Sequence, residues 1–172
     1  MDNWVISLDG WAAGERCFRF HAGLEFFQTF DNTEILDADV AVEVKVTKAG
    51  AQKVSADILL QGTVTVPCDR CLEPLTLPVE ASPRFSVRFD ALEEEGLSED
   101  GKDILAVGVA DKELDIRQAV YDYVCLSLPL QRVHPEGGCN PDTVRFLSVG
   151  QKDEEAAPSS PFAALKGLLK DN

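Results

Sequence analysis

Residues 40–47 read Val40-Ala41-Val42-Glu43-Val44-Lys45-Val46-Thr47, so that valine occupies every second position. Successive side chains of a β-strand point to opposite faces of the sheet, and this alternation therefore predicts a strand with one buried face. Residues 48–51 have the composition of a turn. A second alternating run then passes through Val54, Ala56, Ile58, Leu60, Gly62, Val64 and Val66. Together the two runs predict a long antiparallel hairpin.

The same period of two continues after this hairpin. It returns in two later stretches, at Leu75, Leu77 and Val79 and at Phe85, Val87 and Phe89. Further strands are expected at residues 4–8, 18–20, 24–30 and 104–109, where apolar residues cluster in short runs. The chain therefore predicts a mainly antiparallel sheet, which could close in a barrel-like form.

The period changes after residue 114. Asp115 can cap a helix, and Gln118 stands three residues later as in a capping box. An apolar face at helical spacing follows, and Pro129 ends the element; the face comprises Ile116, Val120, Tyr123, Val124 and Ser127. The expected fold class is α+β, with this one long helix and a short C-terminal amphipathic helix.

The domain organisation follows from composition. We expect a single α+β domain over residues 1–149, a linker over residues 150–160 and a C-terminal helix over residues 161–172. Ser160 and Pro161 are a good helix start, and Phe162 and Leu165 begin an apolar stripe. A helix this short is unstable alone, so we expect Phe162 and Leu165 to contact a partner or the rest of the chain.

The charge of the chain bears on its partners. Its 172 residues include 30 acids against 16 Lys and Arg, for a net charge of -14. Such a chain should be repelled by bare phosphate backbone and attracted by basic proteins. Residues 90–103 are strongly acidic, which predicts a solvated loop or, alternatively, a docking site for a basic partner.

The sequence lacks the motifs of several classes of protein. No secretory signal and no apolar run of membrane-spanning length are present, and we expect a soluble cytoplasmic protein without a membrane role. A Gly-rich phosphate loop and a nucleophile elbow are also missing. We therefore expect no enzymatic activity, and no small-molecule substrate is evident.

Two short motifs contain the candidate metal-ligating residues of the chain. The first reads Cys68-Asp69-Arg70-Cys71 and the second His134-Pro135-Glu136-Gly137-Gly138-Cys139. Two cysteines separated by two residues can place both sulfurs on one side of a turn, as a tetrahedral metal ion requires. We interpret Cys68, Cys71, His134 and Cys139 as a structural zinc site. The alternatives are that the cysteines are small apolar residues beside a solvated histidine, or that the first motif does thiol–disulfide chemistry.

Other polar and sulfur residues give weaker predictions. Cys17 and Cys125 are expected to have packing roles. Arg70 lies between two cysteines and could face a phosphate or a carboxylate, although a solvated turn residue is the default.

Three stretches together resemble the YceD-type family of bacterial and plastid proteins. They are Cys68-Asp69-Arg70-Cys71-Leu72-Glu73-Pro74, the run from Asp115 through Leu128-Pro129 to His134 and Cys139, and Pro161-Phe162-Ala163-Ala164-Leu165-Lys166. The resemblance implies a non-enzymatic role in the accumulation of large-subunit 23S ribosomal RNA, through its synthesis, processing or stability. It does not bring a metal site with it, so the zinc prediction rests on residue spacing.

Two function classes remain open from the sequence. The first is a ribosome-biogenesis factor that contacts a basic ribosomal or RNA-processing protein, which the acidity favours. The second is a zinc-stapled module that binds RNA directly through Arg70, Arg84 and Arg88. The steep salt dependence of phosphate contacts distinguishes them.

Overall fold

The structure is a computed structural model of the chain, and it describes residues 4–50, 53–89, 103–106 and 113–149. The chain forms two compact units. The first, called the sheet unit, comprises Met1–Pro67 and Pro74–Arg132, and the second, called the knuckle unit, comprises Cys68–Glu73 and Val133–Asn172. The C-terminal helix expected at residues 161–172 and most of the acidic run at residues 90–103 lie outside the described residues.

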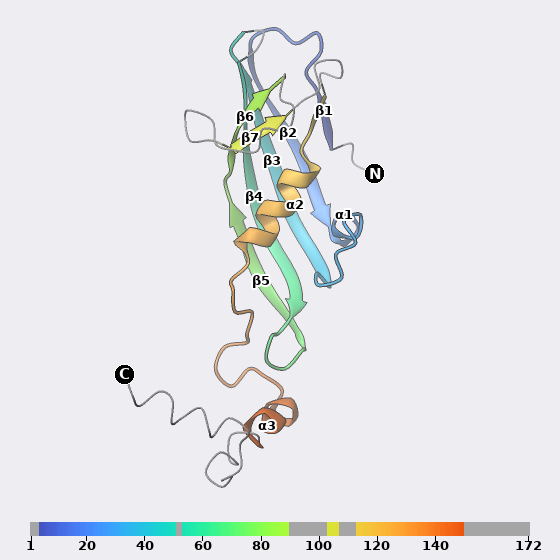
Figure 1. The fold of residues 1–172 in the computed structure, drawn as a ribbon, viewed down its shortest axis with the longest axis vertical. Coiled ribbons are helices and arrows are strands. Elements are labelled where there is room, and N and C mark those ends of the chain that lie inside the picture. The colour runs from blue at the N-terminus through green and yellow to red at the C-terminus, as the bar shows by residue number, and fades with distance from the viewer. Residues whose placement is uncertain (1–3, 51–52, 90–102, 107–112, 150–172) are drawn as a thin grey trace, which may run out of the picture. The chain divides into compact units, whose positions relative to one another are not determined.

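Antiparallel strands dominate the sheet unit (Figure 1). The six-stranded sheet has the order β2-β3-β4-β6-β7, with β5 also pairing with β4. Its strands are β2 (Gly14–Gly23), β3 (Asp37–Lys48), β4 (Val54–Pro67), β5 (Pro74–Ala81), β6 (Arg84–Arg88) and β7 (Asp103–Ala106). A separate two-stranded sheet pairs β1 (Val5–Ser7) with β8 (Glu113–Asp115).

The hairpin predicted from residues 40–66 is confirmed. β3 pairs with β4 along its whole length, so that Val44 lies opposite Ile58 and Val40 opposite Gly62. β5 and β6 then pair with successive stretches of β4, and the carbonyl of Pro83 between them accepts a 3.0 Å hydrogen bond from the Ile58 amide. The strands expected around residues 4–8, 18–20, 75–79 and 85–89 are also present.

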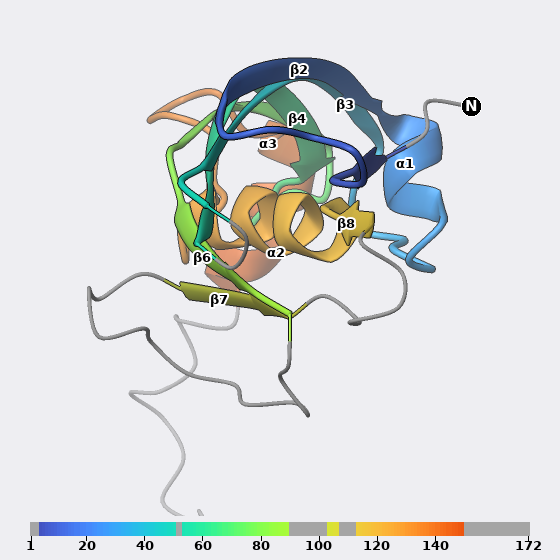
Figure 2. The ribbon, with the colours of Figure 1, turned by 90° about the horizontal axis from the view of Figure 1, so that it is seen from above.

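The sheet is open and does not close into a barrel. β2 and β7 stand at its two ends, and neither has a second strand partner within the described part of the chain. The pairing of β6 with β7 is parallel, which the alternation of apolar residues could not reveal. Figure 2 shows the sheet curving around α2 (Arg117–Ser127), so that one face of the sheet and this helix enclose the core.

Residues 24–30 were expected to form a strand, and this prediction is wrong. They form the short helix α1 (Leu24–Gln28), in which the consecutive residues Phe26 and Phe27 are both buried. Adjacent side chains of a strand face opposite sides, whereas one helical turn can bury both. Phe26 packs on Trp4 with a ring separation of 4.5 Å, and Phe27 on Tyr121 at 6.2 Å.

The helix expected after residue 114 is present as α2, but it is not notably long, with 11 residues. Its buried residues include Val120 and Val124, as predicted. The capping box is wrong: Ile116 takes the N-cap position, and the Gln118 side chain donates to Asp122 at 2.7 Å. Asp115 still accepts a 2.9 Å hydrogen bond from the Arg117 amide, which satisfies one donor of the first turn.

A further helix, α3 (Pro141–Val149), belongs to the knuckle unit and was not expected. Asn140 precedes it, and its side-chain oxygen accepts a 3.0 Å hydrogen bond from the Asp142 amide. Asparagine at the cap followed by proline is a favourable helix start. None of the described helices is both long and apolar enough to cross a membrane.

The environment of the Tyr123 phenol on α2 predicts how the stability of the fold changes at high pH. Its hydroxyl donates a hydrogen bond to Asp103, and this bond, with burial and the Asp103 charge, raises the pKa of Tyr123 to about 12. A raised pKa means that the neutral phenol stabilises the fold fully below its ordinary pKa of about 10, and that this contribution is lost as the pH rises through about 12.

The chain has two tyrosines, so Tyr121→Phe leaves Tyr123 as the only phenol. We expect an ultraviolet titration of this variant to give a midpoint near 12. A midpoint near the ordinary tyrosine value of about 10 would contradict the contact.

Candidate metal centre

The first half of the site is the turn between β4 and β5. The Cys68 amide donates to the Glu73 carbonyl at 2.9 Å, and the Leu72 amide donates to the Cys68 carbonyl at 2.9 Å. Leu72 takes a left-handed backbone conformation, with φ of 62°, which non-glycine residues seldom adopt. These constraints close the turn and leave Cys68 and Cys71 buried, at 0% and 3% exposure.

The second half is the loop that carries His134 and Cys139. The Gly138 amide donates to the Pro135 carbonyl at 2.9 Å, and Gly137 has a φ of 80°. A Cβ atom at Gly138 would lie 3.1 Å from the Pro135 oxygen and 3.2 Å from the His134 Cβ atom. Glycine relieves strain at Gly137 and close contacts at Gly138, where the loop turns back on itself to bring His134 and Cys139 together.

A side-chain hydrogen bond beside the cluster also ties the two halves within the knuckle unit. The Asn140 side chain donates to the Glu73 carboxylate at 2.6 Å, while its oxygen accepts from the start of α3. Asn140 follows Cys139 and Glu73 ends the cysteine turn, so the bond fixes the two segments beside the cluster. Sequence reasoning missed this residue, although Asn140 followed by Pro141 is a recognisable helix start.

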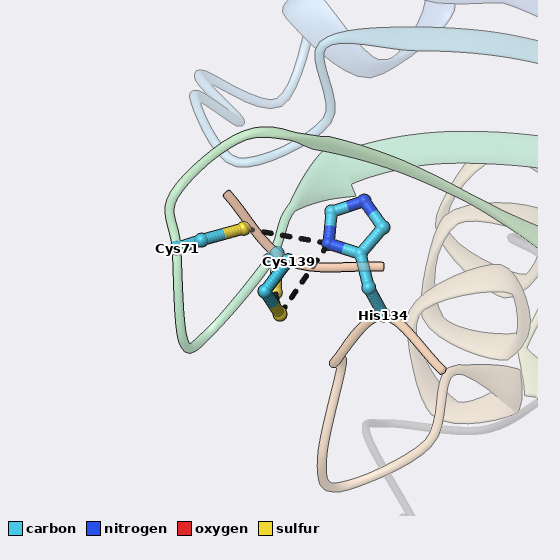
Figure 3. Close-up of side chains that lie close together, drawn as sticks. Cys71, His134 and Cys139 are labelled. Carbon is cyan, nitrogen blue, oxygen red and sulfur yellow. Dashed lines mark hydrogen bonds between the residues drawn. The ribbon is translucent and has the colours of Figure 1, made fainter. Parts of the chain in front are cut away.

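The structure brings the four predicted ligands together. Their donor atoms all lie within 4.8 Å of one another. Figure 3 shows Cys71, from the turn after β4, and Cys139 both directed at His134. The His134 Nδ1 atom is 3.4 Å from the Cys71 Sγ atom and 3.9 Å from the Cys139 Sγ atom, and the Cys68 and Cys139 sulfurs are 3.9 Å apart.

These separations can be compared with the edges of a metal tetrahedron. Metal–sulfur bonds of about 2.3 Å give sulfur–sulfur edges of about 3.8 Å, and a shorter bond to imidazole nitrogen gives sulfur–nitrogen edges of about 3.6 Å. The 3.4–3.9 Å separations of these three pairs match this geometry, and the other pairs lie within 4.8 Å. They also exceed the sulfur–sulfur bond length of about 2.05 Å, and all five cysteines are free.

The electrostatics of the cluster favour a bound cation. Burial opposes ionisation of Cys68, but hydrogen bonds from the backbone of Cys71, Arg70 and His134 outweigh it and lower the pKa of the Cys68 thiol to about 6. One of these donors, the Arg70 amide, lies 3.5 Å from the Cys68 sulfur. Burial, followed by the neighbouring Cys68 and Cys71 sulfurs, raises the pKa of the Cys139 thiol. A cation among the sulfurs would remove that mutual repulsion.

The donor set fits a soft or borderline metal ion. Three thiolates and one imidazole suit zinc, whereas calcium and magnesium prefer oxygen ligands. All four corners of the tetrahedron would be filled by protein atoms, and no corner would remain for a reactive water. Such a site would hold the two segments together at the metal.

The other residues singled out in the sequence have separate positions. The Arg70 side chain is exposed, as expected for a solvated turn residue, and Phe162 and Leu165 lie outside the described residues. Cys125 is half-buried in the sheet unit, beside a cavity of about 230 Å³. The packing role predicted for Cys17 is wrong, because Cys17 is exposed on β2, on the face of the sheet away from the core.

The comparisons with known proteins concern the same part of the chain. A family model described as "Large ribosomal RNA subunit accumulation protein YceD" matches residues 56–169, which is more than half of the chain. The matched region begins within β4 and contains all four residues of the cluster. No solved structure matches the chain.

Proposed function

The chain belongs to the YceD family of large ribosomal RNA subunit accumulation proteins, and from this premise we propose that it is a non-enzymatic biogenesis factor for the large ribosomal subunit. It acts in the cytoplasm, supporting the synthesis, processing or stability of 23S ribosomal RNA. The observation that carries the proposal is the family match over residues 56–169, in which the cysteine–histidine cluster is included.

The cluster serves as a zinc staple in this proposal. Cys68, Cys71, His134 and Cys139 supply the four ligands, and zinc replaces the core that a segment as short as the knuckle unit cannot build for itself. A coordination shell filled by these four protein ligands would suit a structural role for the metal. It also supports the absence of enzymatic chemistry at this site.

The partner is a basic ribosomal or RNA-processing protein. A net charge of -14 favours such a protein over a bare phosphate backbone. Cations of the sheet unit also lie beside acids: Arg19 pairs with Glu43 at 2.7 Å, and Arg84 lies opposite Asp57 in the strand register. An acid opposite Arg84 opposes phosphate binding there, and this supports protein contact over the alternative of direct RNA binding, in which Arg84 would act with Arg70 and Arg88.

The C-terminal segment is the second contact in the proposal. Phe162 and Leu165 form an apolar stripe on a segment too short to be a stable helix alone, and a partner surface would supply the missing burial. This element is proposed from the sequence, since it lies outside the described residues.

A rescue experiment tests the proposed function. We expect cells that lack this chain to accumulate less large-subunit than small-subunit ribosomal RNA, and the wild-type chain to restore the ratio. Phe162→Ala with Leu165→Ala should rescue poorly, because the partner contact is weakened. An unchanged ratio in the deletion strain would refute the function. Steep loss of RNA binding by the purified chain as salt rises would favour the RNA-binding alternative.

A further inference from the structure

Within the described part of the chain, the outer edge of β2, which has 10 residues, pairs with no other strand. Its inner edge pairs with β3 from Gly14 to Gly23 without interruption. On the other side, no backbone hydrogen bond from the described residues reaches β2. Alternate residues of β2 therefore present amide and carbonyl groups that another strand could bind.

The sequence of β2 does not protect this edge with proline. Proteins often block sheet edges with proline, because it lacks the amide hydrogen that an added strand would use. β5, which pairs only with β4 among the described strands, carries Pro74 and Pro78. β2 has no proline between Gly14 and Gly23. The two edges thus differ in whether they can accept another strand.

The charged side chains of β2 do not block the addition of another strand at this edge either. Arg19 pairs with Glu43 at 2.7 Å, and two further pairs, Glu15 with Lys45 at 3.0 Å and His21 with Asp39 at 2.8 Å, also run from β2 to β3. Exposed ion pairs of this kind contribute little to the free energy of folding. They do show which way the side chains of β2 point. These three pairs draw Glu15, Arg19 and His21 inward over the sheet, whereas Arg16 lies over the Trp11 ring, 4.7 Å from its centre.

The core-side face of β2 offers apolar surface to an added strand. Phe18 and Phe20 are only half-buried there. Phe20 stacks on Trp4 at 5.0 Å, and Phe18 meets Trp11 edge-on at 6.5 Å. A strand laid beside β2 would point every second side chain toward these rings. An alternating apolar pattern in the partner would then bury surface that is now partly exposed.

We propose that the outer edge of β2 binds an extended segment of a basic protein, which adds to the sheet as a further strand. The inference rests on the proposed function, because the basic partner comes from there. A second copy of this chain is a poorer occupant, since each copy carries a net charge of -14. The bound segment alternates apolar residues, facing Phe18 and Phe20, with lysine or arginine.

The test uses the full chain and a synthetic peptide that alternates lysine and valine and matches the 10 residues of β2. We expect hydrogen exchange to slow at alternate amides of β2 when this peptide binds. A peptide that alternates glutamate and valine is the matched control and should bind far more weakly. Slowing confined to other segments, or no binding of the basic peptide, would overturn the proposal.

Substitution of Cys17 provides the second arm. Cys17 is exposed on β2 and lies opposite Lys45. We expect Cys17→Lys, which adds a cation beside the edge, to weaken peptide binding about tenfold, while the near-isosteric Cys17→Ser binds like the wild type. Equal binding of the peptide by the wild type and both Cys17 variants would contradict binding at the β2 edge.

The outcomes separate this inference from the proposed function. If the Cys17→Lys protein still restores ribosomal RNA and still captures large-subunit proteins with unchanged affinity, the β2 inference fails and the function stands. If the peptide protects β2 but the deletion strain has normal ribosomal RNA, the edge binds basic segments and the proposed function fails. Protection of β2 that rises with protein concentration alone would identify a second copy as the occupant, and would overturn the basic-partner proposal.

Discussion

The Cys71→Ser protein is expected to lose its stoichiometric metal and the ordered structure of the knuckle unit. Cys71 is 3% exposed, and its sulfur lies 3.4 Å from the His134 Nδ1 atom. Serine keeps the size of the side chain but replaces a thiolate with a hydroxyl, which is a poor ligand for zinc. Binding free energies of about 10 kcal/mol or more are coupled to folding in structural zinc sites, so loss of the metal should unfold the segments that it joins.

The measurements are metal content, thermal stability and hydrogen exchange. Wild-type protein purified without chelator should contain one zinc ion per chain, and chelation should lower its melting temperature. In the Cys71→Ser protein we expect fast exchange in residues 68–73 and 133–149, with protection retained in β3 and β4. Because the ligands must be deprotonated, zinc should also be released as the pH falls.

Cys17→Ser is the matched control, because Cys17 is exposed and is not one of the four clustered residues. It removes one sulfur from the chain and should leave both metal content and melting temperature unchanged. A wild-type metal content well below one per chain would refute the zinc site. So would a Cys71→Ser protein that binds metal as well as the wild type.

Most of the sheet could be predicted because a single physical pattern determines it. The valines of β3 and the apolar residues of β4 alternate with polar ones, and a strand with one buried face has that period. The elements that escaped prediction lack a long period. α1 has 5 residues, and its aromatic residues also suit a strand. α3 follows from a local start signal, Asn140 and Pro141, and not from a long apolar stripe.

The metal cluster could be predicted from ligand type and local spacing, but its supports could not. No residue of the turn marks Leu72 for its φ of 62°, because glycine or asparagine usually takes that conformation. The bond from Asn140 to Glu73 depends on how two segments distant in sequence meet. The exposure of Cys17 has a similar explanation. Its neighbour Phe18 suggested packing, but adjacent residues of a strand face opposite sides, and Cys17 takes the exposed one.

Gly62→Ala is expected to cause the largest loss of stability in the sheet unit. A Cβ atom at Gly62 would lie 2.1 Å from the Asp39 carbonyl oxygen and 2.7 Å from the Val40 Cα atom. Both are backbone atoms of β3, so no side-chain rotation can relieve the overlap. β3 is itself paired with β2 on its other side, and moving it would disturb hydrogen bonds along both of its edges.

We expect Gly62→Ala to lower the free energy of unfolding by about 3 kcal/mol, at the upper end of the usual cost of overpacking. Gly23→Ala is the control, because its nearest atom, His21 Cε1, is at an ordinary 3.6 Å. That variant should cost less than about 1 kcal/mol, most of it from the change at the start of α1. Urea unfolding followed by circular dichroism measures both. If Gly62→Ala unfolds at the same urea concentration as the wild type, then β3 and β4 do not approach as closely as the structure places them, and the hairpin that leads into Cys68 is packed more loosely.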